Sequence, residues 1–169
     1  YRSNLGMGAT KFDVVSICLL TNDANSFTGT GFRIYNEDKA NEILQYAKNI
    51  IDAFLIDNSA TKIVINLPPL IANTKNTGGI SYEAIKYNLF KLSELFLVNF
   101  DDGFYNPNVT MGIAGLSIDR YYGYAKTSTQ IADRIAINED WHINSFHPKN
   151  DGYKQMADGM FPQLLNLLG

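Results

Sequence analysis

Two short apolar runs constrain the fold of this chain more than any other feature. FDVVSICLL, residues 12–20, and KIVINL, residues 62–67, are nearly continuous in apolar residues and rich in β-branched ones. Such runs are typical of strands buried on both faces, as in a parallel sheet. A third strand is predicted over residues 109–118, where Gly112 and Gly115 weaken the pattern.

Helical patterns alternate with these runs, over residues 37–57, near 81–98 and over about 150–168. Their expected inner faces repeat at three- and four-residue spacing: Ile43, Ala47, Ile50 and Phe54; Ile85, Leu89, Leu92 and Phe96; Tyr153, Met156, Met160 and Leu164. Pro162 is expected to kink or split the last helix, and residues 119–140 are expected to be mostly loop. The alternation predicts a single α/β domain over residues 1–169 around a parallel sheet. Three strands leave open edges, so further strands or a cover are expected.

The composition excludes several classes of protein. Apolar residues make up 46 % and charged residues 18 %, as in globular proteins. The net charge is −3 and no basic stripe occurs, which argues against nucleic acid as a partner. No apolar run approaches the ~18 residues that a membrane span needs. Cys18 lies within the first apolar run, and we expect its thiol to be buried. No Cys/His cluster suggests a metal site.

Two polar residues stand where a site of this fold class would lie. Asn22 follows the first strand, and ligands of open α/β sheets bind beyond the carboxyl ends of strands. Its amide could stabilise an oxyanion, or Asn22 could be an ordinary turn residue. His147 stands in Phe-His-Pro. Pro148 disfavours the helical conformation at His147, and Asn150 could cap the helix that follows. A histidine there suits a general base, or it is a surface residue that precedes a helix.

Two blocks of the sequence resemble the SGNH, or GDSL-like, hydrolase family. They are LLTND, residues 19–23, and NSFHPKNDGYKQMAD, residues 144–158; KIVINLPPL also resembles a family strand. LSIDRYYGY looks like versions found in phage and prophage proteins. The resemblance implies a flavodoxin-like, three-layer α/β/α sandwich, with Asn22 as the oxyanion donor and His147 as the base. Asn144 would occupy the position of the family's orienting aspartate. Three neighbouring residues are expected to contact the substrate: Asp23, Pro69 and Phe146.

The chain departs from the family pattern in three ways. It has no Gly-Asp-Ser block, so the nucleophilic serine and the N-terminal strands are expected upstream of Tyr1 or in another chain. Asn144 can orient an imidazole but cannot offset its positive charge. We therefore expect a slow enzyme, a Ser-His dyad, or a carboxylate from elsewhere, for which Asp140 is the candidate. Leu20 stands where the family often has glycine, which narrows the turn before Asn22.

The resemblance implies a serine-type ester hydrolase, an esterase or acetylesterase that could deacetylate a glycan. No metal or organic cofactor is implied. The expected partners are a small ester or acylated glycan and the polypeptide that completes the domain. The alternative is a non-catalytic binding or structural module of a phage tail or cell-surface protein. A virion-associated or secreted location is suspected from the resemblance alone.

Overall fold

The computed structural model describes residues 11–27, 34–69, 82–118, 129–130, 137–138 and 148–168. A short helix α1 follows the first strand, and 3-10 turns η2 and η3 flank the third. The elements in chain order are β1 (Val14–Cys18), α1 (Thr21–Ala24), α2 (Glu37–Asp57), β2 (Lys62–Asn66), α3 (Tyr82–Phe100), η2 (Asp101–Gly103), β3 (Val109–Gly112), η3 (Ala114–Ser117), β4 (Thr129–Gln130), β5 (Ile137–Asn138) and α4 (Asn150–Leu168).

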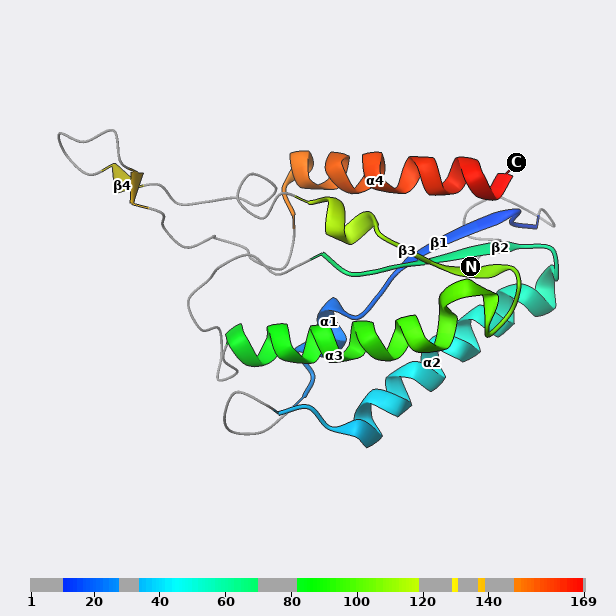
Figure 1. Cartoon of the computed structure of the whole chain (residues 1–169), viewed down its shortest axis with the longest axis horizontal. Coiled ribbons are helices and arrows are strands. Elements are labelled where there is room, and N and C mark those ends of the chain that lie inside the picture. The colour runs from blue at the N-terminus through cyan, green and yellow to red at the C-terminus, as the bar shows by residue number, and fades with distance from the viewer. Residues whose placement is uncertain are drawn as a thin grey trace.

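A three-stranded parallel sheet organises the described residues. Its order is β1-β2-β3, and Cys18, Asn66 and Gly112 lie in register at the carboxyl ends of the three strands. Figure 1 shows α2 and α3 on one face of the sheet and α4 on the other. The predicted parallel α/β architecture is therefore confirmed.

The main core lies between the sheet and the pair α2 and α3. The central strand β2 contributes Ile63 and Ile65, which are at most 2 % exposed. The predicted inner face of α3 is confirmed, since Ile85, Leu89, Leu92 and Phe96 are all buried there. This core holds α3 against the sheet and so fixes the positions of the loops next to α3.

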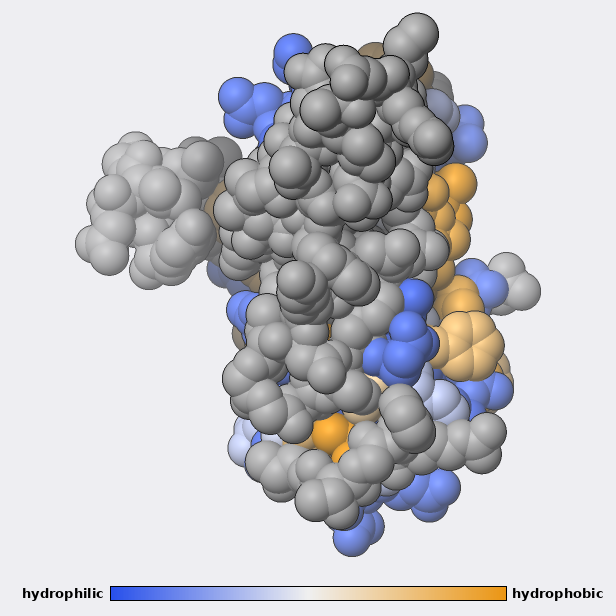
Figure 2. Space-filling model, turned by 90° about the vertical axis from the view of Figure 1, so that its left-hand side faces the viewer, coloured by the Kyte–Doolittle hydropathy of each residue, from blue (hydrophilic) through white to orange (hydrophobic). Residues whose placement is uncertain are grey.

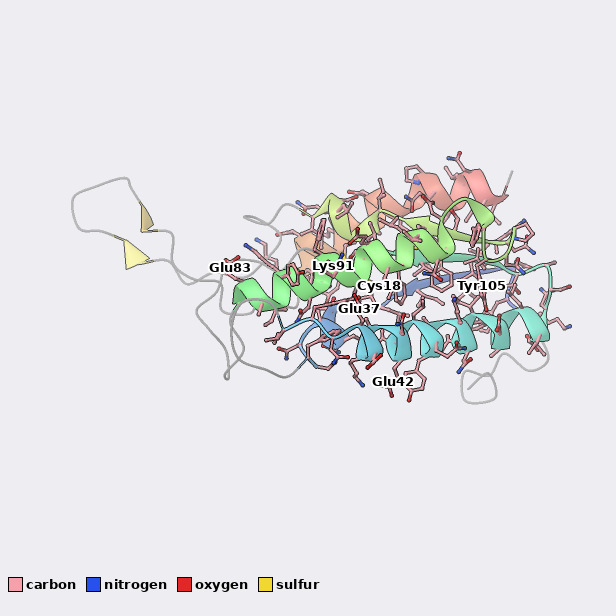
Figure 3. All side chains as sticks on the ribbon, turned by 60° about the horizontal axis from the view of Figure 1, so that its bottom comes forward. Cys18, Glu37, Glu42, Glu83, Lys91 and Tyr105 are labelled. Atoms are coloured by element: carbon pink, nitrogen blue, oxygen red, sulfur yellow. The ribbon has the colours of Figure 1, made fainter. Side chains whose placement is uncertain are left out.

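Helix α2 begins and ends at the predicted residues. The Asn36 side chain caps it by accepting a hydrogen bond from the Lys39 amide at 2.8 Å. The predicted inner face is wrong at Ile50, which is 43 % exposed, whereas its neighbour Ile51 is buried. The outer face is charged, and Figure 3 shows Glu42 pointing away from the sheet.

The third strand is shorter than predicted. It ends at Gly112, and residues 114–117 form η3 instead. Tertiary packing explains the change, because η3 lies directly on the backbone that follows β2. A Cβ atom on Gly115 would lie 2.1 Å from the Leu67 carbonyl oxygen and 2.4 Å from the Pro68 carbonyl carbon. Only glycine allows this approach.

Helix α4 is continuous through Pro162, which neither splits it nor ends it. Asn150 is its first residue rather than its cap, and the Tyr153 amide bonds to the Lys149 carbonyl at 3.1 Å. Gly159 allows α4 to approach η3, since a Cβ atom there would lie 1.9 Å from Ser117 Oγ. Tyr153 was predicted to face inward and is 50 % exposed.

Strand β1 lies at an edge of this sheet, and its exposure differs from the prediction. Val15 and Ile17 pack against the main core, whereas Ser16 and Cys18 are exposed. The expected burial of Cys18 is therefore wrong. By strand alternation Cys18 shares the face of Ser16, and there Met160 of α4 reaches Ser16. Helix α4 packs mainly over η3 and the end of β3, so β1 stays open on that face.

The stretch 119–140 was predicted to be mostly loop. Two residue pairs in it form the short antiparallel ladder of β4 and β5. Among the helices of the described residues, none is both long and apolar enough to cross a membrane.

Candidate active site

The carboxyl edge of the sheet gathers three segments that the sequence singled out. Strand β1 runs into α1 at this edge, β2 runs into Leu67–Pro69, and α4 begins at the same end of the molecule (Figure 1). Parallel strands make this arrangement possible, because all their carboxyl ends meet on one edge.

Leu20 shapes the turn between β1 and α1. Its φ of 80° lies in the left-handed region, and it is the only non-glycine residue with positive φ among those described. This conformation costs about 1–2 kcal/mol in a residue with a Cβ atom. The Leu20 side chain is only 2 % exposed, so its burial offsets the backbone strain. Leucine thus adopts here the conformation that glycine would adopt more easily.

Asn22 and Asp23 follow within α1. The Asp23 carboxylate accepts a hydrogen bond from the Leu20 amide at 3.2 Å, which closes the turn on itself. Asn22 has an exposed side chain, and none of the described residues hydrogen-bonds to that side chain. Asp23 therefore holds the turn, while the Asn22 amide is open to a ligand at the carboxyl edge.

Two buried asparagines support this edge, and we did not single them out from the sequence. Asn88 of α3 donates from Nδ2 to the Ala24 carbonyl at 3.1 Å and so fixes the end of α1. Asn66, the last residue of β2, donates from Nδ2 to Ser16 Oγ at 2.8 Å. Both are at most 2 % exposed. A lone polar residue within an apolar run, as in KIVINL, is the signal that could have identified Asn66.

Pro69, expected to contact the substrate, is buried beneath Gly115. Its neighbour Pro68 lines a pocket beside α3. The accessible surface at the end of β2 is therefore this pocket and not the Pro69 ring.

Four of the expected residues lie outside the described part of the chain: Asp140, Asn144, Phe146 and His147. The nearest described residue is Pro148, which is buried just before α4. Pro148 directly follows His147 in sequence, and α4 starts at the carboxyl edge. The start of α4 therefore lies at the same end of the molecule as Asn22.

Within the described residues, no group of three or more His, Cys, Asp or Glu side chains is arranged to hold a metal ion. No protein-family model matches the chain, and a search of curated proteins finds no match.

Proposed function

We propose that this chain is the C-terminal portion of a flavodoxin-like, SGNH-type domain that acts as a serine-type carboxylic ester hydrolase. The observation that carries the proposal is the shared edge of the sheet. An exposed asparagine follows β1 there, and the chain directly after His147 enters α4 there. The left-handed Leu20 adds support, because it stands where the family often has glycine.

The nucleophilic serine would come from polypeptide upstream of residue 1. The free edge of β1 supports this part of the proposal. Strand β1 has the sequence VVSIC, and none of its residues is fully buried. None of the strands in the described part of the chain pairs with the outer edge of β1, and such an apolar edge is a natural position for a further strand. A strand added there would bring its carboxyl end to the same edge as Asn22.

In the proposed reaction, the upstream serine oxygen attacks the ester carbonyl as His147 takes its proton. The Asn22 amide donates to the oxyanion of the tetrahedral intermediate. The intermediate collapses to an acyl-enzyme as His147 passes the proton to the leaving alcohol. Water then attacks the acyl-enzyme with His147 as base, which releases the acid and restores the serine.

Asn144 would orient the His147 imidazole through its side-chain carbonyl. An amide gives no charge stabilisation to the imidazolium, and an Asp-to-Asn change in a serine protease lowers kcat by about four orders of magnitude. We therefore propose a slow enzyme, unless Asp140 supplies the carboxylate.

The test is p-nitrophenyl acetate hydrolysis by the full-length protein and three variants. His147→Ala should abolish turnover. Asn22→Ala should lower kcat by about 10²–10³, as loss of one oxyanion donor does elsewhere. Asn25→Ala is the matched control, because Asn25 is an exposed asparagine just after α1, and it should leave kcat unchanged. Unchanged turnover in His147→Ala would remove the role given to that residue.

A non-catalytic glycan-binding or structural module is the second candidate. Asn144 in the aspartate position and the absence of a Gly-Asp-Ser block in the chain favour it. A folded full-length protein that hydrolyses no ester but binds an acylated glycan would support this alternative.

A further inference from the structure

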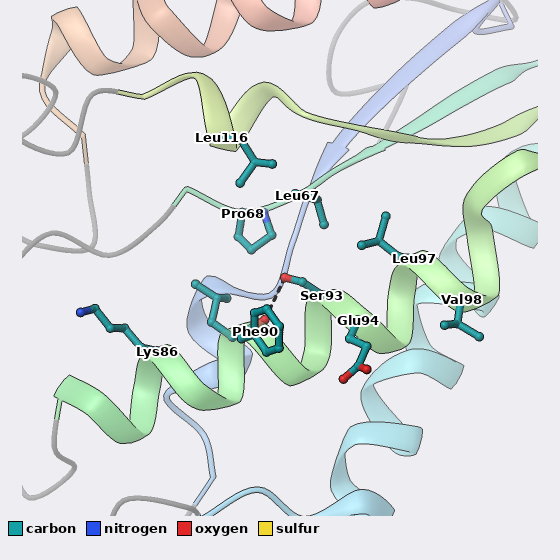
Figure 4. Close-up of a pocket in the computed structure, with 10 residues that line it drawn as sticks. Leu67, Pro68, Lys86, Phe90, Ser93, Glu94, Leu97, Val98 and Leu116 are labelled. Carbon is teal, nitrogen blue, oxygen red and sulfur yellow. Dashed lines mark hydrogen bonds between the residues drawn. The ribbon is translucent and has the colours of Figure 1, made fainter.

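A pocket of about 770 Å³ lies between α3 and the turns that follow β2 and β3 (Figure 4). Leu67, Pro68 and Leu116 form one wall, and Phe90, Leu97 and Val98 of α3 form the other. This volume lies within the range of roughly 300–1,000 Å³ that is typical of small-molecule sites. Pro68, just beyond the carboxyl end of β2, is one of the residues that line it.

The pocket lies along a helix, α3, that is unusual in being apolar on two sides. Its inner side is apolar and buried, as Leu92 and Phe96 show, but its outer side is apolar too. Phe90 is 70 % exposed and Val98 is 73 % exposed. Figure 2, which views the carboxyl end of the sheet, shows apolar side chains gathered along one side of the molecule. A helix that is apolar on two sides is normally covered on both.

The polar groups of the pocket are engaged by α3 itself. Ser93 Oγ donates to the Leu89 carbonyl at 2.8 Å, and the Glu94 carboxylate pairs with Lys91. Lys86 stands at the N-terminal end of the pocket, with Glu83 3.8 Å from its Nζ. The pocket thus presents an apolar trough whose polar side chains are paired within α3, and the matching ligand is a long apolar chain.

The direction of the trough relates it to the candidate active site. Helix α3 runs back from the carboxyl edge, so Lys86 lies near that edge and Val98 lies far from it (Figures 1 and 4). Twelve residue steps of 1.5 Å give a length of roughly 18 Å. The bond from Asn88 to Ala24 at 3.1 Å fixes this helix to the turn that carries Asn22.

We infer that this trough binds the acyl chain of the ester substrate, with the carbonyl end at the carboxyl edge and the chain tail toward Val98. The inference rests on the proposed function and changes the expected substrate from an acetyl ester to a longer acyl ester. A protein partner fits less well, because a stable interface buries roughly 800 Å² on each side. Among the described residues that line the trough, three have exposed apolar side chains, Phe90, Val98 and Leu116, and these are too few for such an area.

The test measures chain-length preference and chain binding separately, in the full-length protein. Hydrolysis of p-nitrophenyl acetate, butyrate, octanoate and decanoate gives kcat/KM against acyl length. Binding of dansylundecanoic acid is followed by its fluorescence. We expect kcat/KM to rise at least tenfold from acetate to octanoate, and the probe to bind to the unmodified protein.

Phe90→Glu and Leu116→Glu each place a carboxylate in the trough at a partly exposed position. Each should weaken probe binding at least tenfold and should lower kcat/KM for octanoate by a larger factor than kcat/KM for acetate. Phe104→Glu is the matched control, since Phe104 is 85 % exposed and lies outside the pocket. Thermal unfolding of each variant verifies that it is folded.

The outcomes separate the two proposals. Acetate turnover without a gain in chain length, together with no probe binding, overturns the acyl trough and leaves the hydrolase in place. Probe binding that Phe90→Glu abolishes, in a protein that turns over no ester, supports the trough and overturns the hydrolase. Equal loss of probe binding in Phe90→Glu and Phe104→Glu overturns the assignment of the binding site.

Discussion

The backbone of Leu20 gives the sharpest test of how the turn before Asn22 is built. Leu20 combines a φ of 80° with a side chain that is 2 % exposed. Leu20→Ala and Leu20→Gly both remove the buried side chain, which should cost about 2–5 kcal/mol of unfolding free energy. They differ in the backbone, because alanine keeps the strain of a left-handed residue and glycine does not. Leu20→Gly should therefore be about 1 kcal/mol more stable than Leu20→Ala.

Leu44 provides the matched control, since it is also a buried leucine but lies within α2. At a helical position glycine is about 1 kcal/mol less stable than alanine. The order of the glycine and alanine variants should thus reverse between the two sites. Urea unfolding of the four variants in the full-length protein measures the difference. If Leu20→Ala is as stable as Leu20→Gly or more stable, the left-handed turn is refuted.

Two further predictions concern the packing around the site and the pH dependence of stability. Gly115→Ala should destabilise the fold by about 1–3 kcal/mol, because its Cβ atom meets the backbone at Leu67 and Pro68. Gly103→Ala has open space and a φ of +68° and should cost only about 1 kcal/mol; equal losses in urea unfolding would contradict the close approach. Tyr105 donates to Asp52 Oδ1 at 2.7 Å, and burial together with this bond raises the pKa of Tyr105 to about 12. This raised pKa contributes stability below pH ~10 that is lost as the pH rises toward 12. Tyr105→Phe should therefore lose less stability than the unmodified protein over that range. If the unfolding free energies of the two proteins, measured in urea, fall in parallel as the pH rises, the stabilising role of the Tyr105 hydroxyl is contradicted.

Secondary structure was the most predictable part of this chain. Helices α2 and α4 begin and end where the apolar spacing places them, because a long amphipathic pattern repeats the same signal over several turns. The exchange of Ile50 for Ile51 shows the limit of that signal. The apolar face of a helix is wide enough that either of two consecutive residues can be the one buried at its margin.

Features set by tertiary packing were not predictable. β3 ends early because η3 packs onto the Leu67–Pro69 backbone, and the sequence shows only the glycines that permit this contact. The positive φ of Leu20 carries no local signal either, since leucine does not favour it. Cys18 is exposed because α4 packs over η3 and the end of β3 and leaves this face of the edge strand β1 open, and this packing cannot be read from an apolar run.

The candidate site was predictable in part. Asn22 lies at the carboxyl edge, as its place after an apolar strand suggested, whereas Asp23 holds the turn and Pro69 is buried. The role of Asn88 was not predictable, because a polar residue on a helix is usually exposed. Only the fold shows that Asn88 is buried and donates a hydrogen bond to the Ala24 carbonyl.

Fluorophosphonate labelling of the full-length protein tests the central claim most directly. A serine hydrolase whose base is His147 should be labelled at one serine upstream of residue 1, and the label should be lost in His147→Ala, which removes the proton acceptor. Asn25→Ala, the control, should be labelled like the unmodified protein. A folded full-length protein that is labelled at no serine, or that is labelled equally with and without His147, would contradict the proposed hydrolase.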